Sequence, residues 1–279
     1  CGMSALPTRK DEAWRYSDLK ALAQVWPRKA TKRSLFIGSG ERFALDDSSS
    51  DAEESADDWV NDECAIHIAA NGRLDGIIRQ DVGSLATIRY ILTLENGAAA
   101  HLVILNHGGT LGRIEMDVTL HDGADFQLGA ILIGNGAQTI ELVTTVRHVG
   151  PNATSRQIVR AVAGGTATTS YLGQVAVARE GQKTDASQSF KAILLNRGAT
   201  ANAKPELEIF ADDVKCAHGA AIGEIDNNAL FYMTSRGVPP AQARALLTRA
   251  FLSDALEGLD EATTEALDAE ITALLETAA

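Results

Sequence analysis

Apolar and polar side chains alternate with a period of two residues in one segment after another along the middle of this chain. Successive side chains of a β-strand point to opposite faces, so this alternation predicts strands that bury one face. The clearest segments are 88–94, 114–120, 126–132, 140–146 and 190–194. Glycines, which accept the positive φ of tight turns, separate the segments at intervals of 12 to 17 residues. They are Gly97, Gly109, Gly123, Gly136, Gly150, Gly165, Gly181 and Gly198.

This spacing is compatible with two architectures, an antiparallel sandwich or barrel and a coiled β-solenoid. The interval stays nearly constant from Gly97 to Gly198, whereas a Greek key needs some long connections. We therefore predict a mainly β fold, a flattened parallel β-helix with roughly 26–30 residues per coil. The end of such a coil leaves a strand edge unpaired, so the fold needs a cap or a partner there.

Charge and periodicity divide the chain into three expected regions. Residues 1–63 form a short N-terminal segment, with a helix expected over 11–25 and an acidic, solvated linker over 46–58. Residues 64–226 form the β-helix core. Residues 227–279 form an α-helical hairpin, because the hydrophobic period changes there to that of a helix.

The boundaries of that hairpin follow from its capping residues. Pro239 and Pro240 suit the first turn of one helix, Gly258 suits its end, and Asp260 suits the N-cap of the second helix. An apolar stripe at helical spacing needs a cover, which we expect a partner protein to provide. The stripe consists of Leu247, Phe251, Ala255 and Leu259.

Several function classes are excluded or disfavoured. A net charge of −12 argues against non-specific nucleic-acid binding, and no run of 18 apolar residues predicts a membrane span. The start, Cys1 to Ser4, has no signal-like apolar stretch, and three cysteines cannot form a disulfide framework, so a cytoplasmic location is expected. The chain has no phosphate-binding Walker loop, and the adjacent Asp212 and Asp213 point to opposite faces of a strand. We expect no enzymatic activity.

One pair of side chains carries possible metal chemistry. On a strand, Cys216 and His218 project from the same face with Cα atoms about 6.6 Å apart. A thiolate and an imidazole at this separation can both bind iron, copper or zinc, with the other ligands coming from a second chain or water. Alternatively, Cys216 is a small buried residue and His218 a hydrogen-bonded core or interface histidine.

The sequence around this pair resembles the SufB/SufD family of iron–sulfur cluster assembly proteins. The resemblance lies in the blocks Gly181–Gln188, Lys204–Ala220 and Ile222–Asp226, and the segment Leu230–Gly237 continues it. Residues Leu6–Leu19 resemble the opening motif of SufD, although the N-terminal region is shorter than is usual for SufD. Cys-Ala-His-Gly at 216–219 resembles the SufD form, and residues 199–211 hold no cysteine to match the separate SufB ligand.

The resemblance implies a right-handed parallel β-helix that serves as a non-catalytic scaffold. SufB and SufD pair through the ends of their β-helices, and each carries a SufC-type ABC ATPase on its C-terminal helices. His218 then matches the histidine implicated in holding a transient Fe–S cluster at the subunit interface, with Cys216 as a second candidate. The residues expected to dock the ATPase are Arg236, Gly237, Pro239, Arg244 and Phe251. The isolated chain should bind no cofactor tightly, and a flavin is a further candidate for the complex.

Two alternatives remain at this point. A SufB-like homodimer would build its cluster or metal site from Cys216 and His218 of two chains. A polysaccharide-active β-helix enzyme would instead use acidic or basic residues in an open groove.

Overall fold

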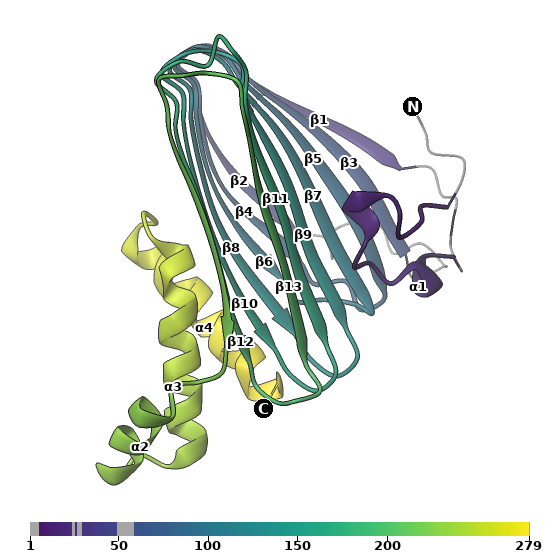
Figure 1. Cartoon of the computed structure of the whole chain (residues 1–279), viewed down its shortest axis with the longest axis vertical. Helices are drawn as coiled ribbons and strands as arrows, with labels where there is room; N and C mark the ends of the chain where they lie inside the picture. The colour runs from purple at the N-terminus through teal and green to yellow at the C-terminus, as the bar shows by residue number, and fades with distance from the viewer. Residues whose placement is uncertain (1–5, 24–25, 27–29, 49–58, 279) are drawn as a thin grey trace.

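The computed structural model describes residues 6–23, 26, 30–48 and 59–278, and these form a β-solenoid with C-terminal helices (Figure 1). All strand pairings among these residues are parallel, which confirms the solenoid and excludes the antiparallel sandwich. The odd sheet consists of β1 (Thr31–Ile37), β3 (Trp59–Ile68), β5 (Leu85–Leu94), β7 (Leu111–Leu120), β9 (Thr139–His148), β11 (Thr168–Val177) and β13 (Thr200–Ile209). The even sheet consists of β2 (Arg42–Ser48), β4 (Arg73–Gln80), β6 (Ala99–Asn106), β8 (Asp125–Gly134), β10 (Thr154–Ala163), β12 (Asp185–Leu194) and β14 (Lys215–Gly223).

The coils stack in step, so that side chains in equivalent positions lie above one another. Leu85 pairs with Leu111, which is 26 residues later, and Thr168 pairs with Thr200, which is 32 residues later. The inward-facing rows of both sheets are buried between the sheets and form one apolar column along the solenoid. Each coil is therefore covered by the coil before it and the coil after it.

The solenoid begins earlier in the chain than position 64. β1 and β2 pair with β3 and β4 and form the first rung. Asp46 and Asp47 belong to β2 and not to a linker, whereas residues 49–58 of the expected linker lie outside the described residues. The Asp47 carboxylate accepts hydrogen bonds from the Arg33 guanidinium (2.9 and 3.1 Å) and from the buried Tyr90 hydroxyl (2.7 Å). An ion pair thus lies at the N-terminal end of the apolar column.

The helix expected over 11–25 is wrong as a single element. A 3₁₀ turn, η1 (Glu12–Trp14), precedes a short helix, α1 (Leu19–Ala23), and Val25 lies outside the described residues. Asp18 accepts hydrogen bonds from the backbone N–H groups of Lys20 and Ala21 (3.0 and 3.1 Å) and so starts the helix anew.

Long-range contacts explain why the N-terminal segment does not form one helix. The Ser17 hydroxyl donates to Glu141 of β9 (2.6 Å), and the Arg113 guanidinium of β7 lies 4.0 Å from the centre of the Trp14 ring. Arg113 and Glu141 themselves form a buried ion pair at 2.8 Å. These contacts fix residues 14–17 to the outer face of the odd sheet (Figure 1).

Three α-helices follow the solenoid instead of the predicted hairpin. They are α2 (Asn227–Ser235), α3 (Pro240–Leu252) and α4 (Glu261–Ala278), with a 3₁₀ turn, η3 (Ser253–Leu256), after α3. The start at Pro240 and the cap at Asp260 are confirmed, since Asp260 accepts from the Thr263 N–H at 3.0 Å. The sequence analysis missed α2, which Asp226 caps by accepting from the Asn228 N–H (2.8 Å).

The expectation of an uncovered apolar stripe on these helices is wrong. Three of its residues, Phe251, Ala255 and Leu259, pack on the outer face of the even sheet in a second core, whereas Leu247 is half-buried outside that core (Figure 1). The helical side supplies Leu252, Ala255, Leu256, Leu267, Ile271 and Leu275, and the sheet supplies Val103, Leu105, Ile131, Ile133 and Val162. The sequence carries a sign of this cover, because β6 and β8 have apolar residues on both faces.

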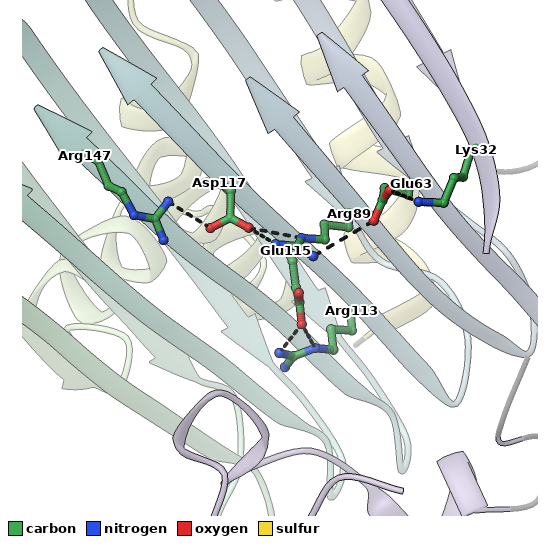
Figure 2. Close-up of polar contacts among 7 residues, drawn as sticks. All are labelled: Lys32, Glu63, Arg89, Arg113, Glu115, Asp117 and Arg147. Carbon is green, nitrogen blue, oxygen red and sulfur yellow. Dashed lines mark hydrogen bonds and ion pairs between the residues drawn. The ribbon is translucent and has the colours of Figure 1, made fainter. Parts of the chain in front are cut away.

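The outer face of the odd sheet carries a ladder of charges that alternate in sign from strand to strand (Figure 2). Glu63 of β3 bonds Lys32 of β1 (2.7 Å) and lies 4.0 Å from Arg89 of β5. Asp117 of β7 bonds Arg89 (2.5 Å) and Arg147 of β9 (3.4 Å). Opposite charges on neighbouring strands favour the observed register, because a slipped strand would bring like charges together.

Gly129 of β8 sets how closely the helices approach the even sheet. A Cβ at this position would overlap the backbone carbonyl oxygen of Ala255 in η3. We expect Gly129→Ala to lower the free energy of unfolding by about 1–3 kcal/mol, because η3 must move away. Urea denaturation measures this, with Gly219→Ala as the control, since a Cβ at Gly219 on strand β14 meets no atom within 4 Å. Equal stability of the two variants would contradict the close approach.

His148 makes the stability of the fold depend on pH. Its buried imidazole contacts the Ser155 and Thr184 hydroxyls (2.9 and 3.4 Å), and burial lowers the pKa of His148 to about 4. An unfolded chain would protonate it near its ordinary value of 6.5, so its contribution is present above pH 6.5 and is lost as pH falls toward 4. We expect the difference between wild type and His148→Gln to shrink by about 3 kcal/mol over that interval in chemical denaturation. A difference that does not change with pH would contradict the buried neutral imidazole.

Candidate partner and cluster interface

The last rung of the solenoid, formed by β13 and β14, leaves its inward row uncovered. β13 and β14 are the terminal strands of their sheets, so each has one unpaired edge. Ile222, in the inward row of β14, is 47% exposed, and Phe210 directly after β13 is 61% exposed. Apolar side chains that earlier coils bury between the sheets therefore face outward at this end.

Cys216 and His218 lie in that inward row, as the strand spacing predicted. Cys216 pairs with Ala186 and His218 with Gln188 on β12, and both β12 residues are buried. Cys216 packs partly against the apolar column, and burial raises the pKa of its thiol. His218 is exposed at the edge. The Cys216 side chain is thus half-buried, whereas the His218 imidazole is exposed.

Polar side chains lie in the column directly beneath His218. The Tyr171 hydroxyl lies 3.1 Å from Gln188 Oε1 and 3.3 Å from Gln157 Oε1, and the Gln188 amide donates to the backbone oxygen of Glu206 (3.1 Å). A Cβ at Gly173 would overlap the Tyr171 hydroxyl, so the glycine provides the room for this ring. The bond from Gln188 to Glu206 ties β12 to β13 of the last rung.

The described ranges bring together no three His, Cys, Asp or Glu side chains in a geometry that could hold a metal ion. Asp212 and Asp213 follow β13 as part of an exposed turn, in which the Asp213 N–H donates to the Gln182 side chain (3.0 Å). The candidate donors at this end are thus the imidazole of His218 and the thiol of Cys216.

Four of the five residues expected to dock a partner are exposed at the junction of α2 and α3. Arg236, Gly237, Pro239 and Arg244 lie there, and Gly237 has a φ of +90° that favours glycine. Phe251 lies elsewhere: it packs against the core between the helices and the even sheet, with the Arg160 guanidinium 5.9 Å from its ring centre.

The sequence analysis missed two exposed aromatic side chains on α2. Phe231 is 73% exposed and Tyr232 is 59% exposed, and the Arg236 guanidinium lies 4.9 Å from the Tyr232 ring centre. The signal was the run Leu230-Phe231-Tyr232-Met233, which places more large apolar residues on α2 than one helix face can bury. Helix α2 extends away from the solenoid and contacts α3 (Figure 1).

A membrane-spanning helix would need a longer and more apolar stretch than any helix of the described residues provides.

Comparison with known proteins gives a family match over most of the chain. Residues 40–251 match the family model described as SUF system FeS cluster assembly, SufBD core domain. The matched range contains both sheets almost entirely, the last rung, α2 and most of α3.

Relatives come from plants and bacteria. The chain is 32% identical over 203 residues to Protein ABCI7, chloroplastic, of Arabidopsis thaliana, covering 71% of this chain and 43% of that protein. It is 28% identical over 199 residues to the iron–sulfur cluster assembly protein SufD of Escherichia coli, covering 70% of this chain and 47% of that protein. The SufD of Bacillus subtilis is 28% identical over 159 residues, which cover 57% of this chain and 36% of that protein. The chain thus spans less than half the length of these relatives.

The two phenylalanines of the helical region should differ in their contribution to stability. We expect Phe251→Ala to lower the free energy of unfolding by about 1–3 kcal/mol, since it removes a partly buried ring that packs against the core. Phe231→Ala should change it by less than about 0.5 kcal/mol, because that ring is exposed. Thermal and chemical denaturation of both variants checks the placement, and a large loss at Phe231 would contradict it.

Proposed function

Since this chain belongs to the SufBD family of iron–sulfur cluster assembly proteins, we propose that it is a SufD-like, non-catalytic scaffold subunit. In this role it pairs with a SufB-type subunit through the last rung of its solenoid. It carries a SufC-type ABC ATPase on its C-terminal helices. The observation that carries the proposal is the uncovered inward row of β14, in which His218 is exposed beside Cys216.

The pairing follows from the two free strand edges of the last rung. A partner rung in the same arrangement would satisfy the unpaired backbone groups of β13 and β14 and cover Ile222 and Phe210. His218 would lie inside that interface. Its imidazole then becomes a ligand held in place by the strand, while the surrounding apolar side chains exclude water.

The nascent Fe–S cluster is cargo in this proposal. His218 supplies one ligand and Cys216 is a second candidate, so the partner must supply the remaining thiolates. His218 is exposed whereas Cys216 is half-buried, which favours His218 as the ligand from this chain. A homodimer that pairs two copies of this rung is the other arrangement with the same interface.

The exposed surface of α2 supports the ATPase contact. Phe231 and Tyr232 are both exposed, and Arg236 lies over the Tyr232 ring. Exposed aromatic residues and arginine are enriched in protein–protein hot spots. Because α3 and α4 cover the even sheet, deleting residues 237–279 would expose a core. Point substitutions on α2 are therefore the cleaner test.

The cytoplasmic location and the flavin stay predictions, and one relative is chloroplastic by its printed name.

We expect His218→Ala to reduce cluster formation about tenfold or more in reconstitution with a SufB-type partner, iron, sulfide and the ATPase. The measurement is the visible absorbance of the cluster per complex. The control is His67→Ala, a partly exposed histidine on β3 near the other end of the solenoid. Undiminished cluster yield with intact pairing would refute the ligand role, and a stable cluster on this chain alone would favour the homodimer.

We expect the double variant Phe231→Ala, Tyr232→Ala to weaken ATPase binding by at least about 2 kcal/mol, roughly thirtyfold in Kd. Isothermal titration calorimetry with the purified ATPase measures this. Substituting exposed Glu261 at the start of α4 by Gln is the control, and unchanged affinity of the double variant would remove α2 from the interface.

A further inference from the structure

We infer that Arg160 is a positioning residue that joins the C-terminal helices to β12, the strand that pairs with β14 of the last rung. Its side chain projects from the outer face of β10 and is 5% exposed. On one side, Nε and Nη2 donate to Asp254 of η3 (3.3 and 3.0 Å). On the other side, Nη1 donates to the backbone oxygen of Ser189 on β12 (3.2 Å) and lies 3.3 Å from its hydroxyl.

The contact with β12 distinguishes Arg160 from the other ion pairs between solenoid and helices. Arg79 bonds Glu270 from β4 (3.1 Å), and Arg156 bonds Glu257 from β10 (2.8 Å). Arg79 also bonds Asp46 on the neighbouring β2, at the first coils of the solenoid. Arg160 instead reaches β12, the strand next to the last rung. That strand, β12, pairs with β14, and Gln188 next to Ser189 lies opposite His218.

The chemistry of arginine suits this bridge. Its planar guanidinium carries five N–H donors in a fixed fork, and here they are divided between an acid on the helical side and backbone oxygens on the strand side. Leaving a buried guanidinium without its counter-ion destabilises the fold strongly. The Arg160 side chain would therefore move with Asp254 if η3 moved. A displacement of the helices would thereby strain the hydrogen bonds to β12.

This inference concerns contacts within the chain and goes beyond the proposed function. It would hold whether or not an ATPase binds α2 or a cluster forms at His218. If the proposed function also holds, Arg160 provides one route by which movement of the helices could affect the last rung.

Amide hydrogen exchange of the full chain, resolved by peptide mass spectrometry, tests the bridge. Asp254→Asn, at a side chain that is 53% exposed, should speed exchange of residues 185–194 and 215–223 roughly tenfold. In an Arg160→Met background the same change should add nothing, because the bridge is already absent. Arg160→Lys should restore part of this dependence on Asp254, since the lysine ammonium keeps the positive charge but lacks the forked N–H donors of the guanidinium.

The matched control uses the neighbouring pair on the same strand. Glu257→Gln and Arg156→Met also remove an ion pair between β10 and the helical region, and they should leave exchange in β12 and β14 unchanged. A second readout is the alkylation rate of Cys216, followed on its own peptide, which should rise with Asp254→Asn but not with Glu257→Gln.

The pattern across variants decides the question. Equal effects of the two ion pairs on β12 and β14, or additive effects of Asp254→Asn and Arg160→Met, would overturn the inference. If Arg160→Met fails to fold, Asp254→Asn and Glu257→Gln still decide it, because both alter acids that are more than half exposed. Absence of any acceleration by Asp254→Asn would then overturn it.

Discussion

The whole architecture depends on the in-step stacking of inward-facing side chains. Each coil buries its apolar row against the coils on either side. A coil in the middle of the solenoid is therefore covered on both sides, whereas the coil at each end has a neighbour on one side only. At the N-terminal end, Arg33 and Asp47 place a paired charge over the column. At the C-terminal end, Ile222 and His218 remain exposed in the inward row. The two ends thus differ chemically, and the proposed function places the partner at the second.

The two flanks of the solenoid also differ. The even sheet has apolar residues on its outer face, and the helices complete that side as a second core. The odd sheet presents alternating charges and holds the N-terminal segment through the buried pair of Arg113 and Glu141. Because the chain's own helices cover the even sheet, that flank is closed. Helix α2, with its exposed aromatic rings, is the part of the helical region that faces away from the solenoid.

Two contact surfaces therefore lie on one frame, the last rung and the outer side of α2. Gly129 allows η3 to rest directly on β8, and the Arg160 side chain ties η3 to β12. The proposed function assigns these surfaces to two partners, which such a frame would hold at fixed positions relative to each other.

The sequence by itself determined the coil. Alternation with a period of two sets the strands, and regularly spaced glycines set the turns, before any strand packs on another. It also determined that Cys216 and His218 share one face of a terminal strand, and that helices begin at Pro240 and after Asp260. Only the tertiary structure decided what covers each apolar face and where the N-terminal helix breaks. Ser17 meets Glu141 across 124 residues of chain, and Arg79 of β4 meets Glu270 of α4 across 191, so no local pattern specifies these contacts. Their free energy arises only when the coils have stacked and brought the distant surfaces together.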